Sequence, residues 1–203
     1  MNQKPKEQGC VTPALYRCAY PAPYPEIRVT RPNLAYARLL LEDYAGVVSE
    51  TSAIMQYNYH HFVLEKQYED AADLVSCISL VEMHHQEMLA ETIMLLGEDP
   101  SYRIYTAANT EKYWDASYVF YGTDICDRIA MDIAGEWAAI ANYRQHQRMI
   151  DDPCIKELLE RIILDELHHL ALFSQIMQKY CRTQLPRQDA TMPVPDLSSP
   201  PTK

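Results

Sequence analysis

SLVEMHHQEM, residues 79–88, contains a glutamate three positions before a histidine, and LDELHHL, residues 164–170, repeats that spacing. Side chains three residues apart lie on the same face of a helix, so each Glu-x-x-His pair would point in one direction. Both stretches lie within sequence whose apolar residues recur at helical spacing. The pattern therefore predicts two helices that each present a carboxylate and an imidazole to the interior.

A glutamate and a tyrosine precede each pair, and they are seven residues apart, which is almost two helical turns. The first half of the chain offers Glu50, Tyr57, Glu82 and His85, and the second half offers Glu136, Tyr143, Glu166 and His169. The second glutamate and tyrosine follow the first by 86 residues, and the second Glu-x-x-His pair follows by 84. A turn of different length explains the slip, so we expect two related helical hairpins and an internal two-fold axis.

Composition limits the classes of protein that fit. The 203 residues can bury a sizeable core, and 48% hydrophobic residues with only five glycines favour long helices. A net charge of −10 argues against binding to nucleic acid or to an anionic membrane surface. No apolar run is long enough to predict a membrane span, and the first residues lack a signal-peptide pattern, so a cytoplasmic location is expected.

Periodicity and punctuation predict an all-α fold. We expect helices over residues 33–67, 70–96, 124–149 and 153–181. Because the joins are short, we expect the first and second helices to be antiparallel neighbours, and likewise the third and fourth. An aromatic, non-periodic stretch over 101–122 would form a long crossover between the two pairs. The predicted organisation is an extended Pro/Tyr-rich arm (1–32), a four-helix bundle (33–182) and a Pro-rich tail that we expect to be disordered (183–203).

Six cysteines are scattered along the chain without a C-x-x-C pair, which fits neither a zinc knuckle nor a rubredoxin-type iron site. We interpret them as reduced thiols that serve mainly in packing.

Four carboxylates and two imidazoles in an apolar interior would be very costly without partners. Two divalent cations would satisfy them and balance the four negative charges. A ligand set rich in oxygen with one nitrogen per metal suits iron(II) or manganese(II), whereas zinc prefers a smaller tetrahedral set. The sequence therefore predicts two divalent metal ions per chain, iron or manganese, without choosing between them.

The six positions resemble those of the ferritin-like dimetal carboxylate proteins, which include bacterioferritin, rubrerythrin and the manganese catalases. The resemblance covers about residues 33–182. It implies a ferritin-like bundle with bridging ligands Glu82 and Glu166, terminal ligands Glu50 and Glu136, histidine ligands His85 and His169, and second-layer hydrogen-bond partners Tyr57 and Tyr143. Rubrerythrins carry a further glutamate where this chain has Ala139, and in manganese catalases the glutamate at the position of Glu166 can lie behind the metal ligands.

A metal-bound histidine usually donates its other nitrogen to a carboxylate. Asp132, one turn before the third-helix glutamate, is the candidate that we predict for this role, ahead of Asp43.

These residues predict a metal-dependent oxidoreductase that acts on H2O2 or O2, as a peroxidase, a catalase or a ferroxidase. A peroxidase would need an external electron donor, since none is fused to the chain. A homo-oligomer is expected. The alternatives are a subunit of an iron-storage shell and a structural coat protein whose tyrosine-rich arm is cross-linked.

Overall fold

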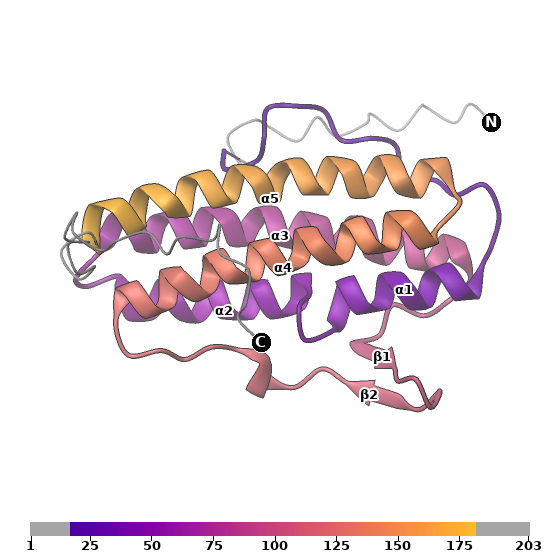
Figure 1. Cartoon of the computed structure of the whole chain (residues 1–203), viewed down its shortest axis with the longest axis horizontal. Coiled ribbons are helices and arrows are strands. Elements are labelled where there is room, and N and C mark those ends of the chain that lie inside the picture. Colours follow the sequence, from indigo (N-terminus) through magenta and orange to yellow (C-terminus); the bar gives the residue numbers. More distant parts are fainter. Residues whose placement is uncertain (1–16, 182–203) are drawn as a thin grey trace, which may run out of the picture.

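The computed structural model describes residues 17–181, so the start of the predicted arm and the predicted tail lie outside the described residues. The helices are α1 (Leu34–Ala45), α2 (Glu50–Leu64), α3 (Glu69–Leu96), α4 (Ile125–Met149) and α5 (Pro153–Tyr180). Figure 1 shows them side by side along one axis, with α1 and α2 end to end. The α2 helix packs most extensively on α3, and α4 on α5. The predicted helical bundle of two hairpins is therefore confirmed.

Local chemistry explains where these helices begin and end. The side chains of Asn33, Asp124 and Asp152 accept backbone hydrogen bonds at the first turns of α1, α4 and α5. At the other end of α3, Gly97 has a φ of 97°, a left-handed conformation that favours glycine. The predicted bounds of the last three helices are reproduced to within about one residue.

The prediction of one continuous helix over residues 33–67 is wrong, because residues 46–49 interrupt it. A Cβ atom on Gly46 would lie 2.5 Å from the carbonyl oxygen of Glu42, so the bend requires glycine. The hydroxyl of Ser49 caps α2, and it also donates to the Gly46 carbonyl at 2.8 Å. Val47 lies in this interruption and is 54% exposed.

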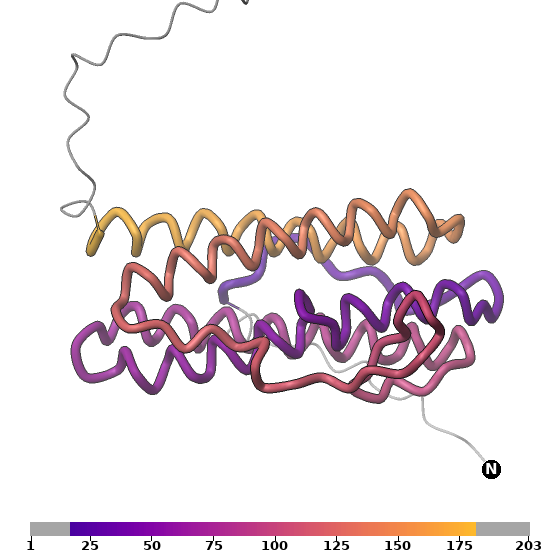
Figure 2. The backbone as a smooth tube through the Cα atoms, turned by 60° about the horizontal axis from the view of Figure 1, so that its bottom comes forward, coloured from indigo at the N-terminus to yellow at the C-terminus, as the bar shows by residue number. Residues whose placement is uncertain are grey.

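The crossover between α3 and α4 contains a small hairpin that the all-α prediction omitted. Strands β1 (Arg103–Tyr105) and β2 (Glu111–Tyr113) pair antiparallel, and a 3-10 turn, η1 (Ala116–Tyr118), follows them. Strands of three residues are too short to show an alternating pattern in sequence. Figure 2 shows the crossover running alongside α1 and α2.

The core is divided into two apolar clusters. One joins α1 to the second half of α3 and the first half of α5, through residues such as Leu40, Leu89, Ile93, Leu159 and Ile162. The other joins α2 to the first half of α3, the first half of α4 and the second half of α5, through Leu64, Val75, Ile78, Ile129 and Phe173. Along α3 and α5 the two Glu-x-x-His pairs lie between these clusters, so a polar layer separates them.

The interpretation of the cysteines as reduced thiols is wrong for four of the six. Cys18 is bonded to Cys77, and Cys126 is bonded to Cys181, while Cys154 is a free thiol. The sequence could not show this, because the paired residues are 59 and 55 positions apart. Disulfides persist mainly in oxidising surroundings, so the cytoplasmic location stays a prediction.

Within residues 17–181, no helix combines the length and the hydropathy needed to cross a membrane.

A buried ion pair joins α1 to α4, and it accounts for Asp43, the lesser candidate for a histidine partner. His146 Nδ1 lies 2.7 Å from Asp43 Oδ2, and both side chains are buried. Burial lowers the pKa of His146, but the hydrogen bonds to Asp43 and Glu42 outweigh it and raise that pKa to about 9. Burial raises the pKa of Asp43 to about 6, so the pair is ionised between these two values.

We predict that His146→Gln lowers the free energy of unfolding by roughly 3 kcal/mol near pH 7, because it leaves the buried Asp43 carboxylate without its cation. The pKa of His146 is raised from the usual 6.5 to about 9 in the folded state. The contribution of His146 to the free energy of unfolding is therefore complete below pH 6.5 and is lost as the pH rises through about 9. Thermal unfolding from pH 6 to 10 should show the wild type and the variant converging above pH 9. Asp43→Asn should converge with the wild type in the same range, and a constant gap across the range would contradict this assignment.

Candidate metal centre

The polar layer brings together the six residues that the sequence singled out as ligands. The helices α2 and α4 supply Glu50 and Glu136, α3 supplies Glu82 and His85, and α5 supplies Glu166 and His169. None of the six is more than 3% exposed. The carboxylate of Glu50 lies at the first residue of α2, where the helix dipole favours a negative charge.

The imidazole of His85 faces three carboxylates. Its Nδ1 atom lies 2.9 Å from Glu82 Oε2, 3.3 Å from Glu166 Oε1 and 3.7 Å from Glu50 Oε1. These four residues offer ligand atoms that all lie within 4.8 Å of one another.

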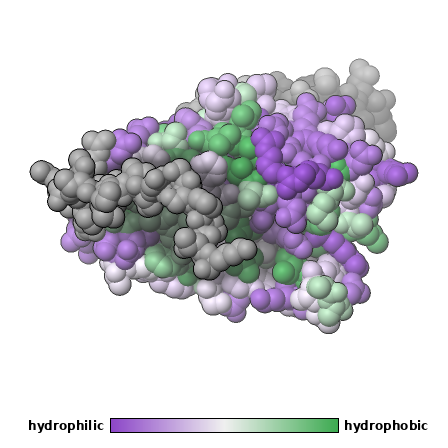
Figure 3. All heavy atoms as spheres, in the orientation of Figure 1, coloured by the Kyte–Doolittle hydropathy of each residue, from purple (hydrophilic) through white to green (hydrophobic). Residues whose placement is uncertain are grey.

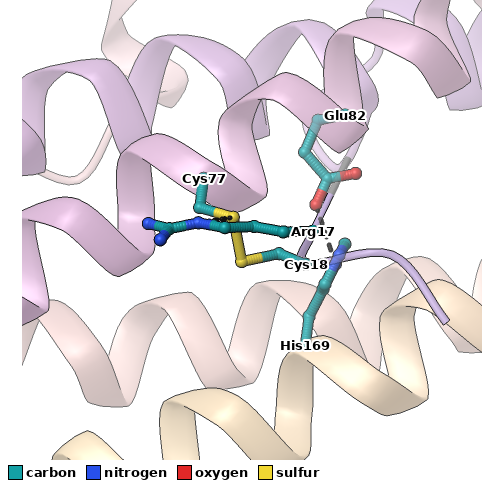
Figure 4. Close-up of a disulfide and its surroundings, with 5 residues drawn as sticks. All are labelled: Arg17, Cys18, Cys77, Glu82 and His169. Atoms are coloured by element: carbon teal, nitrogen blue, oxygen red, sulfur yellow. Dashed lines mark hydrogen bonds and ion pairs between the residues drawn. A yellow bond between two sulfur atoms is a disulfide. The ribbon is translucent and has the colours of Figure 1, made fainter. Parts of the chain in front are cut away.

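The imidazole of His169 mirrors this arrangement. Its Nδ1 atom lies 2.9 Å from Glu166 Oε2, 3.1 Å from Glu82 Oε1 and 3.6 Å from Glu136 Oε1. This second group also lies within 4.8 Å and shares Glu82 and Glu166 with the first. Figure 4 shows the Glu82 carboxylate pointing from α3 toward His169 on the facing helix. Two cations could therefore be held side by side, with the two shared glutamates between them.

The pKa shifts show how strongly these groups need compensating charge. Burial, together with neighbouring carboxylates, raises the pKa of Glu50 and of Glu136 well above the usual value. Burial also opposes ionisation of Glu82, yet His169 and His85 outweigh it and hold the pKa at about 2. Burial lowers the pKa of the two histidines, but the surrounding carboxylates raise it well above 6.5. Bound protons therefore balance charge in this layer that metal cations could balance instead.

One buried atom shows directly that the residues fit a cation. Glu82 Oε1 accepts no well-aligned hydrogen bond from any group within residues 17–181, although His169 Nδ1 lies 3.1 Å away. A carboxylate oxygen that is buried without a donor is costly unless a cation binds it. Oxygen donors with one imidazole nitrogen at each position form the kind of ligand set that iron(II) and manganese(II) accept.

The two tyrosines contact the centre, but each reaches across to the other half of the molecule. Tyr57 donates to Glu136 Oε1 at 2.6 Å, and Tyr143 donates to Glu50 Oε1. Each tyrosine therefore supports the terminal glutamate of the other hairpin rather than the glutamate on its own helix. Burial raises the pKa of both phenols, so they stay protonated and act as donors.

The structure assigns a different carboxylate to the histidine-partner role predicted for Asp132. Asp165 Oδ2 lies 2.8 Å from His85 Nε2. A cation on Nδ1 requires the ring hydrogen to be on Nε2, which can then donate to Asp165. Asp132 is instead held by His60 Nδ1 at 3.0 Å and by Gln56 Nε2 at 2.8 Å. Asp165 was not among the predicted residues although it directly precedes Glu166, because it meets a histidine 80 positions away, which helical spacing does not reveal.

The two histidines differ in this second layer. Among the described residues, His169 Nε2 is a buried atom without a hydrogen-bond partner. Val81 occupies the position on α3 that corresponds to Asp165 on α5, 84 residues earlier. The six candidate metal ligands thus follow the internal two-fold axis, whereas the hydrogen bonding of the two histidine Nε2 atoms does not.

A cavity of about 300 Å³ opens onto the centre. Glu50, Glu82, Glu136 and Glu166 line it, together with Tyr57. Its walls come from the interrupted segment before α2, from small residues of α4 and from the crossover, including Val47, Val48, Gly135, Ala138, Ala139, Tyr118 and Phe120. A small neutral molecule could reach the carboxylates through these mostly apolar walls.

Comparison with known proteins agrees with this geometry. The family model "Manganese containing catalase" matches residues 24–113, a segment that includes Glu50, Glu82 and His85. A probable manganese catalase of Clostridium acetobutylicum is 29% identical over 171 residues, which cover 76% of this chain and 75% of that protein.

Solved structures share the fold. The manganese catalase KatB of Anabaena superimposes with a TM-score of 0.73 at 22% identity, over 86% of this chain and 85% of that one. A Desulfovibrio desulfuricans bacterioferritin with a diiron site gives a TM-score of 0.61 at 25% identity, over 74% and 84% of the two chains. In its fold, its buried carboxylate–histidine clusters and its relatives, this chain is similar to the ferritin-like dimetal carboxylate proteins.

Proposed function

We propose that this protein is a dimanganese oxidoreductase that converts hydrogen peroxide to dioxygen and water. The observation that carries the proposal is the pair of ligand groups that share Glu82 and Glu166, which both line a cavity of about 300 Å³. Glu50 and His85 would complete one metal position, and Glu136 and His169 the other.

The proposed reaction needs no external electron donor. Glu50, Glu82, His85, Glu136, Glu166 and His169 would hold the two ions, which when bound would supply two-electron redox chemistry. In the overall reaction one peroxide molecule is reduced to two water molecules, and a second is oxidised to dioxygen and provides the two protons and two electrons that the first consumes. The chain's own groups hold the terminal carboxylates in place. Tyr57 and Tyr143 each donate a hydrogen bond to a glutamate of the opposite hairpin, which fixes the orientation of Glu136 and Glu50.

The cavity supports a small, neutral substrate. Its walls include the alanines and glycine of α4 and the valines before α2, which offer few hydrogen bonds to larger polar molecules. Hydrogen peroxide is uncharged and scarcely larger than water, so the free-energy cost of its entry into such a passage is small. The same walls would limit contact between the centre and organic reductants.

Manganese is preferred to iron because the matching family model and the Clostridium relative are both described as manganese catalases. The likeness to bacterioferritin keeps ferroxidase chemistry as the alternative that the experiments below distinguish. These comparisons do not favour an iron-storage shell or a structural coat.

Self-association is part of the proposal. Figure 3 shows hydrophobic residues exposed near the middle of the face in view, between hydrophilic regions. The α4 helix contributes Met131, Trp137 and Met149 to the exposed large hydrophobic residues, with Trp137 57% exposed. Exposed apolar surface of this kind is typical of contacts between subunits.

We predict that the purified protein binds close to two manganese ions per chain and that Glu82→Ala binds fewer than one, because it removes a ligand from both positions. Elemental analysis after anaerobic loading measures this. Glu91→Ala is the matched control, since it removes an exposed glutamate from the same helix and should keep both ions. Two iron ions in place of manganese would favour the ferroxidase alternative, and no metal in the wild type would overturn the proposal.

The manganese-loaded protein should release one dioxygen molecule for every two peroxide molecules consumed, without an added reductant. An oxygen electrode measures the stoichiometry directly. Peroxide consumption that depends on an added electron donor and releases no dioxygen would indicate a peroxidase instead.

Narrowing the cavity should slow this reaction without changing metal content. A Cβ atom on Gly135 meets no atom within 4 Å, so Gly135→Ala fits, whereas the larger side chain of Gly135→Leu would extend into the cavity. We expect Gly135→Leu to lower kcat/KM for peroxide about tenfold, equivalent to about 1.4 kcal/mol, and Gly135→Ala to remain near the wild type. Equal activity in all three proteins would mean that peroxide enters by another route.

A further inference from the structure

The described part of the arm that precedes α1 is fixed to the bundle near both of its ends. Its described part, residues 17–33, crosses the outside of α5 (Figure 1). Near its start, Cys18 forms a disulfide with Cys77 of α3, which Figure 4 shows in close-up. Near its end, the backbone nitrogen and the hydroxyl of Thr30 donate to Asp152 Oδ2 at 2.8 and 2.7 Å.

Between these anchors, the arm contacts the buried carboxylate of Asp165 twice. The backbone nitrogen of Tyr20 donates to Asp165 Oδ1, and the hydroxyl of Tyr24 donates to Asp165 Oδ2, both at 2.6 Å. Arg161 Nη1 lies 2.8 Å from Asp165 Oδ1. Because Asp165 is 0% exposed, these three contacts determine where its carboxylate lies.

Arg161 also ties the arm to α5. Its guanidinium donates to the carbonyl oxygens of Tyr20 and Ala22 at 2.9 to 3.1 Å, and its Cζ atom lies 3.9 Å from the centre of the Tyr24 ring. The edge of the Tyr24 ring packs on His84, with ring centres 4.6 Å apart. The arm is therefore held in one position relative to Asp165.

Asp165 transmits this placement to the metal centre, because its Oδ2 atom accepts the hydrogen bond of His85 Nε2. The contact directs His85 Nδ1 toward Glu82, Glu166 and Glu50. His169 has no comparable support, since its Nε2 atom lacks a partner among the described residues. The arm thus reaches one of the two metal positions and leaves the other unsupported.

We propose that the arm is a clamp for the metal position at His85, with Tyr24 and Asp165 as positioning residues and the Cys18–Cys77 disulfide as the bond that keeps the clamp closed. The inference rests on the proposed dimetal function. It makes the two positions unequal: the ion at His85 depends on the clamp, and the ion at His169 does not.

Opening the clamp requires a dithiol reductant. The reductant gives two electrons and two protons, the Cys18–Cys77 bond breaks to leave two thiols, and the two sulfurs of the reductant join in a disulfide. Arg17 Nε lies 3.2 Å from Cys77 Sγ, and a neighbouring guanidinium stabilises a thiolate, so Cys77 is suited to leave in this exchange.

The decisive experiment measures manganese release into an excess of chelator. The loaded full-length wild type is compared with Tyr24→Phe and with the double variant Cys18→Ser/Cys77→Ser. Two matched controls are Tyr36→Phe, which loses one tyrosine hydroxyl that contacts the backbone of Asp151, and Cys126→Ser/Cys181→Ser, which loses the other disulfide. Thermal unfolding of all five proteins is recorded in parallel.

We expect the wild type and both controls to release their two ions slowly. In Tyr24→Phe and Cys18→Ser/Cys77→Ser, one ion per chain should leave about tenfold faster, as is common when the support of a metal-bound histidine is removed, and the other should stay. Both disulfide variants should lose thermal stability, so stability alone cannot produce the difference in release.

Three results would overturn the clamp. The first is release from the Tyr24→Phe and Cys18→Ser/Cys77→Ser proteins at the wild-type rate. The second is faster release of both ions together, and the third is equal acceleration in the two disulfide variants. A wild type that binds no manganese or iron overturns the proposed function itself, which distinguishes failure of the function from failure of the clamp.

Discussion

Every other feature of this molecule depends on four carboxylates and two imidazoles that share one buried layer. Such groups are very costly in an apolar core unless cations and hydrogen bonds compensate them. The structure provides hydrogen-bond partners around the layer: Tyr57 and Tyr143 donate to the terminal glutamates, and Asp165 accepts from His85. The apolar core is correspondingly divided into two clusters, one on each side of the layer.

Residues near the centre obey the internal two-fold symmetry, whereas residues further from it do not. Tyr57 and Tyr143 correspond, and so do His60 and His146, each pair 86 residues apart. The partners of these histidines differ, because Asp132 lies four residues before Glu136, whereas the corresponding position before Glu50 is the bend at Gly46. The bend also places Val47 and Val48, which precede α2, in the wall of the cavity.

Segments outside the helices complete the centre. The crossover supplies Tyr118 and Phe120 to the cavity, and it is bound to α2 where the backbone nitrogen of Phe120 donates to Gln56 at 2.9 Å. On the opposite side, the arm reaches Asp165 through Tyr24. A bundle of helices alone would leave both sides of the centre open, so these two segments determine what can reach it and how its histidines are held.

The sequence by itself determined the last three helices, the pairing of hairpins and the six residues of the polar layer, but not the break at residues 46–49. These follow from local rules, because helical periodicity assigns each side chain to a face and a Glu-x-x-His spacing assigns two ligands to one face. Local punctuation also fixed most helix ends, as at Gly97 and Asp152.

Only the tertiary structure decided the contacts between distant segments. Tyr57 bonding to Glu136 spans 79 positions, Asp165 bonding to His85 spans 80, and the Cys18–Cys77 disulfide spans 59. No local rule relates such residues, because which of several polar side chains meet depends on how the helices pack and on where the arm crosses them. The physical reason is that helical spacing fixes direction within one helix, whereas partners across the core are fixed only when the helices are packed together.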